Sequence, residues 1–267
     1  MAERVEVITA GVLAGVPHGF LGRRGGVSTG DVVGLNVGLG AGDDGDAVSE
    51  NRRRAVAAVM PDARLTTVYQ VHSPDCVVVT APWADDARPQ ADAMVTNQPG
   101  LLLGIVTADC APVLFVDHEA RVIGAAHAGW KGAFGGVTDQ TIAAMETLGA
   151  SRDRIATAIG PCIAAASYEV DDRFMAQFCA SDAASAAYFS AGQPGHWQFD
   201  LEAYVANRLK AAGLRRIERL GQDTYAHSAR YFSFRRATHL GQSTYGRQFS
   251  LIGLPLEAAV ESVMEPV

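Results

Sequence analysis

The chain alternates between short apolar runs and longer segments in which apolar residues recur every three or four positions. The short runs are rich in Val, Ile or Leu, which is the pattern of central β-strands covered on both faces. The predicted strands are residues 65–71, 76–80, 101–107, 112–116, 122–126, 155–159 and 249–254. The periodic segments predict amphipathic helices at residues 47–60, 137–148 and 201–212.

Residues beside these helices carry the usual signals for helix ends. Pro61 stops the first helix and Gly149 ends the second. Asp200 is the predicted N-cap of the third helix, and Gly213 is its predicted C-cap. Two further segments are the predicted long surface loops, at residues 81–90 and 180–198.

The order of these elements predicts an α+β fold with mixed sheets and flanking helices. The runs at 76–80, 101–107 and 112–116 are joined by connections too short for helical crossovers, so part of the sheet is expected to be antiparallel. The chain contains no proline-rich linker, low-complexity tract or fixed-period repeat. We therefore predict a single domain over residues 1–267.

Composition and charge narrow the classes of function. Of the 267 residues, 48% are hydrophobic and 19% are charged, which is enough apolar material for a substantial core. The net charge of -7 argues against nucleic acid or an anionic membrane as partner. The first residues include Glu3 and Glu6 and lack the apolar run of a signal peptide. With four cysteines in this context, we expect a cytoplasmic protein with reduced thiols.

Three metal-binding side chains lie at the ends of predicted strands. His72 follows the run 65–71, Cys110 follows the run 101–107, and His127 follows the run 122–126. If these strands share one sheet, the three side chains would converge at its rim. One thiolate and two imidazoles suit zinc and leave a fourth position open, as in catalytic sites. Burial of Cys and His in the core is the alternative that spacing alone leaves open.

The residues around these three side chains favour a site over simple packing. Asp109 places a carboxylate beside the thiol of Cys110. The segment His-Ala-Gly-Trp-Lys-Gly at 127–132 places two glycines around an aromatic and a cationic residue, and glycines allow the backbone to approach a ligand closely. The same Cys110 and His127 could also form the thiolate–imidazolium pair of a cysteine hydrolase, although that chemistry does not need His72.

Three blocks of sequence identify a family resemblance. They are Tyr-Gln-Val-His at 69–72, Thr-Ala-Asp-Cys-Ala-Pro-Val at 107–113 and His-Ala-Gly-Trp-Lys-Gly at 127–132. Further blocks lie at 23–28, 34–38, 160–163 and 246–248, so the match covers almost the whole chain. These blocks resemble the YfiH family, which has been labelled a multicopper polyphenol oxidase or laccase domain. The family is also described as a zinc-dependent purine nucleoside phosphorylase with adenosine deaminase activity.

The resemblance implies an α+β domain similar to cysteine hydrolases, with His72, Cys110 and His127 as zinc ligands. It implies a purine nucleoside and phosphate as small-molecule partners, and catalytic roles for Asp109, Cys110 and His127. Asp109 is the candidate proton shuttle for deamination; the alternative is that it only orients a ligand. The expected substrate-binding residues are Arg23, Asn36, Gln70, Lys131, Arg235, Arg236 and Arg247. Among the cations, Arg235 and Arg247 are the strongest candidates for phosphate.

Other functions stay open beside this one. A four-copper oxidase needs about ten imidazoles, usually in His-x-His pairs. The chain has seven histidines and no such pair, so copper bound in place of zinc is the most that the laccase label allows. Correction of a misincorporated amino acid in a peptidoglycan precursor and non-catalytic purine binding are further alternatives. Two features depart from the family pattern: Asp223 stands where a cysteine is usual, and the segment 237–245 is longer than usual.

Overall fold

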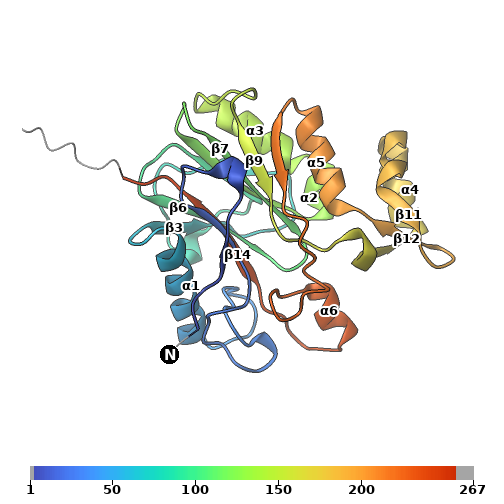
Figure 1. Cartoon of the computed structure of the whole chain (residues 1–267), viewed down its shortest axis with the longest axis horizontal. Coiled ribbons are helices and arrows are strands. Elements are labelled where there is room, and N and C mark those ends of the chain that lie inside the picture. The colour runs from blue at the N-terminus through green and yellow to red at the C-terminus, as the bar shows by residue number, and fades with distance from the viewer. Residues whose placement is uncertain (1–2, 257–267) are drawn as a thin grey trace, which may run out of the picture.

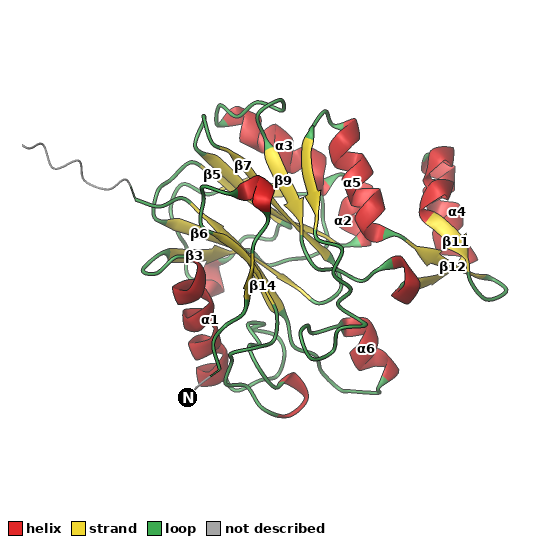
Figure 2. Ribbon diagram, in the orientation of Figure 1, coloured by secondary structure: helices red, strands yellow, loops and turns green. Residues whose placement is uncertain are grey.

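Two large β-sheets lie face to face, and helices cover their outer faces (Figures 1 and 2). The computed structural model describes residues 3–256. The first sheet has the strand order β1-β2-β14-β6-β3. Its strands are β1 (Val7–Ile8), β2 (His18–Leu21), β14 (Gln248–Gly253), β6 (Leu101–Thr107) and β3 (Arg64–Thr67). Only the β3–β6 pair of this sheet is parallel, so the sheet is mixed.

The second sheet has the order β13-β9-β7-β8-β5-β4. Its strands are β13 (Arg216–Arg219), β9 (Ala156–Ile159), β7 (Ala111–Asp117), β8 (Val122–Ala128), β5 (Ala93–Thr96) and β4 (Cys76–Val78). The two outer pairs are parallel and the three inner pairs are antiparallel. A third sheet of order β10-β12-β11 consists of Glu169–Asp171, His196–Phe199 and Phe189–Ala191.

Six α-helices complete the described part of the chain. They are α1 (Gly45–Val59), α2 (Trp130–Gly135), α3 (Val137–Thr147), α4 (Asp172–Ser181), α5 (Leu201–Ala211) and α6 (Phe234–His239). Asp44 and Asp200 cap α1 and α5, since each side chain accepts a hydrogen bond from the backbone three residues on. Gly213, at φ 97°, directly follows the C-cap of α5, so the predicted end of that helix holds to within one residue.

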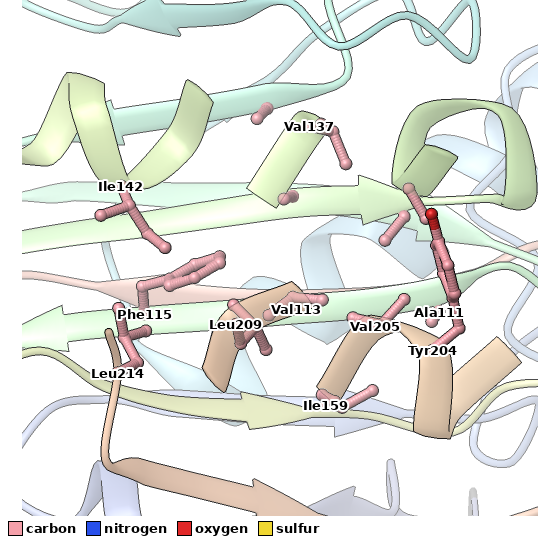
Figure 3. Close-up of a cluster of buried hydrophobic side chains, with 14 of the residues drawn as sticks. Ala111, Val113, Phe115, Val137, Ile142, Ile159, Tyr204, Val205, Leu209 and Leu214 are labelled. Carbon is pink, nitrogen blue, oxygen red and sulfur yellow. The ribbon is translucent and has the colours of Figure 1, made fainter. Parts of the chain in front are cut away.

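The apolar residues form one layer between the sheets and one on each outer face. Alternate residues of β6 and β7, such as Ile105 and Leu114, meet in the central layer. On the outer face of the second sheet, Val113 and Phe115 of β7 pack against Ile142 of α3 and Leu209 of α5 (Figure 3). Helix α1 covers the outer face of the first sheet. These layers hold strand ends from both sheets in fixed positions.

The structure confirms the predicted α+β class with mixed sheets and each predicted strand and helix. Antiparallel pairs are present as predicted, but they do not join the runs 76–80, 101–107 and 112–116 to one another. The segment 81–90 is a surface loop with one short 3-10 helix, Asp85–Ala87, as predicted. The prediction of a loop over 180–198 is wrong, because this segment contains the 3-10 helix Ala183–Tyr188, β11 and most of β12. Its aromatic side chains pack against α4 and anchor it, an effect that local polarity does not reveal.

Candidate metal centre

The three predicted metal ligands converge where the two large sheets meet. His72 lies beyond the carboxyl end of β3, Cys110 lies between β6 and β7, and His127 lies within β8. Their strands do not share one sheet, because β3 and β6 belong to the first sheet and β8 to the second. Convergence arises instead from the face-to-face packing of the sheets, which brings the rim of one against the other.

The donor atoms are close enough to share one ion. The Sγ of Cys110 lies 3.8 Å from Nε2 of His72, and the donor atoms of all three side chains lie within 4.8 Å of one another. The His72 and His127 rings meet edge to face at 4.7 Å. Exposure increases from buried His127 through half-buried Cys110 to exposed His72. An ion at this position would be anchored in the core and accessible to a ligand from the His72 side.

Backbone strain marks the same place. His72 and Asp109 have φ angles of 61° and 88°, in the left-handed region that residues other than glycine rarely adopt. Each such residue costs about 1–3 kcal/mol and persists where the surrounding structure enforces it. One strained residue is the predicted ligand His72 and the other directly precedes Cys110, so the strained backbone lies at two of the three donors.

Asp92 is a member of the site that the sequence analysis missed. Its fully buried carboxylate lies 2.7 Å from Nδ1 of His127 and also accepts hydrogen bonds from the backbone N–H groups of Val71 and Ser73. This carboxylate therefore connects the His127 ring to the segment that carries His72. Because Nδ1 is held by Asp92, Nε2 of His127 is the nitrogen left to bind a metal, the arrangement common in carboxylate–histidine–metal sites.

The electrostatics of the site favour a charged thiolate. Burial alone would raise the pKa of Cys110, but the charge and hydrogen bonding of His127, with a smaller effect of His72, lower it to about 6. Burial would likewise lower the pKa of His127, yet the Cys110 thiolate and Asp92 raise it to about 9. Since metal ligands must be deprotonated, the Cys110 thiolate is already in its binding form at neutral pH, whereas a metal ion has to displace a proton from His127.

The donor set fits a single metal ion. Two imidazole nitrogens and one thiolate sulfur are ligands that zinc accepts, with bond lengths of about 2.0–2.3 Å that require donors a few ångströms apart. The observed separations need only a small contraction to meet that requirement. Within residues 3–256, no second group of three such side chains lies close together. The site has the ligand count of a catalytic centre with one open position.

Gly129 makes room for two of the ligands. A Cβ atom at this position would lie 2.8 Å from Sγ of Cys110 and 2.9 Å from Cδ2 of His72. Such contacts are shorter than van der Waals separations, so both ligands would have to shift. The glycine of the His-Ala-Gly-Trp block is therefore needed for space at the metal group rather than for an unusual backbone angle, since its φ is -64°.

Replacing Gly129 by alanine is expected to weaken metal binding by about 10- to 100-fold, the range seen when support of a metal ligand is lost. The measurement is competitive titration of the metal with a chromogenic chelator. Gly135→Ala on the neighbouring helix is the matched control, because its Cβ would meet nothing closer than 3.6 Å. Equal metal affinity for the two variants would contradict the role given to Gly129.

Two cavities flank the metal group and share His72, Ala108, Cys110 and Tyr245 as walls. The first, here called the arginine cavity, has a volume of about 350 Å³. It is lined by Arg52, Arg88 and Arg247 together with Thr67 and Thr107. The second, here called the aromatic cavity, has a volume of about 390 Å³ and is lined by Trp130, Tyr168, Phe234 and Tyr245. A ligand of the metal could therefore extend into a basic space on one side and an aromatic space on the other.

The predicted substrate residues separate into two groups. Lys131 and Arg235 line the aromatic cavity, where Arg235 lies over the Tyr168 ring at 5.3 Å. Arg247 and Gln70 line the arginine cavity, and the Gln70 amide exchanges two hydrogen bonds with the backbone of Val106. These four residues are therefore brought to the metal group by the fold.

The other three predicted residues lie elsewhere. Asn36 is fully buried, and its side-chain oxygen accepts hydrogen bonds from the backbone N–H groups of Gly38 and Arg247. The guanidinium groups of Arg23 and Arg236 donate to backbone carbonyls, and both residues line a separate cavity of about 340 Å³. The structure thus gives these three side chains roles in holding loops rather than bringing them to the metal.

Asp109 lines the aromatic cavity, but its carboxylate is already heavily used. It accepts hydrogen bonds from Thr224 Oγ1, Ser233 Oγ and the backbone N–H of Arg235. Burial nevertheless raises the pKa of this carboxyl above its ordinary value. These contacts tie the strained Asp109–Cys110 turn to the C-terminal segment. They favour the alternative in which Asp109 orients Cys110 and Arg235.

Asp223, the departure from the family pattern, has a structural role in the same region. Its carboxylate accepts hydrogen bonds from the backbone N–H groups of Ala164 and Tyr225 and from Oγ of Ser167.

No helix within residues 3–256 is long and apolar enough to cross a membrane. The fold and the site therefore define an α+β protein with a group of three donors that could hold a metal ion, between a basic and an aromatic cavity.

Comparison with known proteins places the chain in a family. Residues 17–255 match the family model described as multi-copper polyphenol oxidoreductase laccase. The chain belongs to this family, the YfiH family. A Deinococcus radiodurans protein named purine nucleoside phosphorylase is 40% identical over 90% of each chain, and Escherichia coli purine nucleoside phosphorylase YfiH is 35% identical over 87% of this chain and 91% of its own. The crystal structure of a DUF152 protein from Neisseria meningitidis superposes with a TM-score of 0.84 at 32% identity, covering 95% of this chain and 100% of the other.

Proposed function

We propose that this protein is a zinc-dependent purine nucleoside phosphorylase that also deaminates adenosine. The observation that carries the proposal is the junction of three features: the His72–Cys110–His127 group, the arginine cavity and the aromatic cavity. A nucleoside has a planar base that suits aromatic walls, and phosphate is a multiply charged anion that suits arginines. The names of the relatives support the phosphorylase activity.

In phosphorolysis, an oxygen of hydrogen phosphate forms a bond to C1′ of the ribose while the bond from C1′ to the purine nitrogen breaks. The electron pair of that bond leaves with the purine, and the proton of hydrogen phosphate ends on the purine nitrogen. The protein must therefore hold an anion and a sugar in line and stabilise charge on the departing base. A zinc ion, when bound, would supply Lewis-acid polarisation between the two cavities.

The chain's own residues supply the positioning. Arg247 is available for the anion, and Lys131 and Arg235 provide cations beside the aromatic walls that would face a departing base. In deamination, the oxygen of water replaces the amino group of adenosine and ammonia leaves. Asp109 is the carboxylate in the lining of the aromatic cavity, and in this step it orients Cys110 and Arg235, as its three hydrogen bonds favour. All four cysteines are free thiols, which agrees with the proposed cytoplasmic location.

The test is product analysis on the purified protein with inosine or adenosine. We expect hypoxanthine or adenine to be released together with ribose 1-phosphate, and only when inorganic phosphate is present. Adenosine should also give inosine in a reaction that does not need phosphate. Base release at equal rates with and without phosphate, or no release from any purine nucleoside, would reject the phosphorylase assignment.

A cysteine hydrolase is the second candidate, and one observation favours it. Asp92, His127 and Cys110 form a chain in which a carboxylate orients an imidazole beside a thiolate of lowered pKa, the arrangement of a nucleophilic cysteine site. A cysteine hydrolase would not need His72, whereas a metal site would use His72 as a ligand. Metal content therefore separates the two candidates.

A further inference from the structure

The arginine cavity has an unusual charge balance for a protein with an excess of acidic residues. Three arginines line it, and no Asp or Glu is among the described residues of its wall. Burial lowers the pKa of Arg52, Asp85 opposes that effect, and the nearby positive charge of Arg88 lowers the pKa further. Asp85, which lies outside this wall, pairs with Arg52 at 3.0 Å and with Arg88 at 3.9 Å, so Arg247 is the wall arginine for which the described residues supply no carboxylate partner.

Arg247 has an unused donor in this cavity. Its Nη2 donates to the Tyr245 hydroxyl at 3.0 Å, and its guanidinium lies 4.4 Å from the centre of the Tyr245 ring. Its Nη1 atom is buried and has no hydrogen-bond partner in the described part of the chain. A buried guanidinium donor without a partner costs free energy, and a charged acceptor would recover it.

Two threonine hydroxyls share this property. Thr67 at the end of β3 is 4% exposed, and Thr107 at the end of β6 is 2% exposed. Both residues line the arginine cavity, and neither hydroxyl has a partner among residues 3–256. Three buried polar groups without partners in the wall of one cavity are more than packing explains, since most buried polar groups are hydrogen-bonded.

The other arginines near the site provide a contrast. Arg236 makes three hydrogen bonds to backbone carbonyls, of Thr224, Tyr225 and Tyr231, so its donors serve the fold. Arg52 bonds the Val37 carbonyl and the Asp85 carboxylate. Arg247 therefore combines a free buried donor with a position in the wall that Cys110 and His127 also line.

We propose that the arginine cavity is an oxyanion subsite in which Arg247 Nη1 and the hydroxyls of Thr67 and Thr107 bind one tetrahedral oxyanion next to the metal group. The choice of inorganic phosphate as that oxyanion rests on the proposed function. The nucleoside base then occupies the aromatic cavity on the other side of Cys110, and the ribose lies between them at the metal. Arg52 and Arg88 add positive charge to this subsite, but not all of their N–H donors contact the anion.

Gly38 offers a way to disturb this subsite without changing any charge. A Cβ atom there would lie 3.0 Å from Nη1 of Arg247 and 3.1 Å from its Cδ. Gly38→Ala is therefore expected to push the guanidinium out of place. This variant separates the position of the donor from its charge, which Arg247→Gln removes entirely.

The experiment is calorimetric titration of inorganic phosphate into the metal-loaded protein without nucleoside. Arg247→Gln is expected to weaken phosphate binding by about 10- to 100-fold, the value of a charge-assisted hydrogen bond. Gly38→Ala should weaken it in the same direction, and Thr107→Val by about 3- to 10-fold. Arg215→Gln removes an equal charge from an exposed pair with Asp153 and should have no effect. Circular dichroism confirms that each variant is folded.

The outcomes distinguish this subsite from the proposed function. Phosphate binding that needs Arg247 in a protein without phosphorylase activity would keep the subsite and reject the function. Phosphorolysis with phosphate affinity unchanged in Arg247→Gln and Gly38→Ala, but lost in Lys131→Gln, would overturn the subsite and place the anion in the aromatic cavity. Thr107→Val gives a further check, because removal of a hydroxyl without a partner should not lower the melting temperature, whereas loss of a structural hydrogen bond would.

Discussion

Cys110→Ala, purified without added metal, is expected to lack zinc, whereas the wild type is expected to contain about one zinc ion per chain. Phosphorolysis should then fall by at least about 100-fold, since loss of the charged ligand removes both the metal and its activation of the substrate. The effect is expected to be large because Cys110 is the only one of the three donors that carries a negative charge. Plasma mass spectrometry of the two proteins measures the metal directly.

Cys179→Ala is the matched control, because this thiol lies in α4, outside the linings of both cavities, and its loss should leave the metal content unchanged. The opposite result has a clear meaning. A metal-free wild type whose Cys110 reacts stoichiometrically with a thiol probe would reject zinc and support the cysteine hydrolase. In such a protein the pKa of about 6 predicts that alkylation of Cys110 is already fast at pH 7 and slows as the pH falls below 6.

The sequence predicts those parts of the fold that depend on local pattern. The strands that end beside His72 and Cys110 are apolar runs whose neighbours in sequence are enough to identify them. Strand β5 (Ala93–Thr96) was not predicted, because its four residues are too few to show a hydrophobic period. Asp92, which directly precedes this strand, was missed for the same reason. A polar residue just before an apolar run, within Ala-Asp-Ala-Met-Val, was the signal that could have indicated a buried carboxylate.

Roles that depend on contacts between distant segments were beyond sequence reasoning. Arg236 and Arg247 are both predicted substrate-binding residues, yet one is held by backbone carbonyls and the other keeps a buried donor free of protein partners within the described residues. Asn36 looks like a binding residue in its glycine-rich block but holds the backbone of Arg247 instead. The convergence of the ligands likewise depends on two sheets meeting, a packing result that no short motif encodes.

Asp92→Asn is expected to reduce metal affinity by about 10- to 100-fold although Asp92 does not touch the metal. An amide has one acceptor oxygen and one donor nitrogen, whereas the wild-type carboxylate accepts on both sides: from His127 on one and from the Val71 and Ser73 backbone on the other. When Nε2 of His127 binds the metal, Nδ1 carries the proton, so one side of the amide then opposes a donor with a donor whichever way it turns. Chelator competition measures the affinity, and Asp75→Asn, an exposed carboxylate nearby, is the charge control.

The same variant should also lower the free energy of unfolding at neutral pH, by roughly 1.5–3 kcal/mol for the loss of buried hydrogen bonds to a charged group. Burial would raise the pKa of Asp92, but the hydrogen bond and charge of His127, together with the backbone N–H groups of Ser73 and Val71, lower it. The ionised carboxylate therefore stabilises the fold above the ordinary pKa of about 3.9, and this contribution disappears as the pH falls through the lowered value. Denaturant titrations of the metal-free proteins should thus show the wild type and Asp92→Asn converging in acid. If the difference in unfolding free energy between the wild type and Asp92→Asn stayed constant as the pH fell through the lowered pKa of Asp92, then Asp92 would act through packing alone and not as the charge that orients His127.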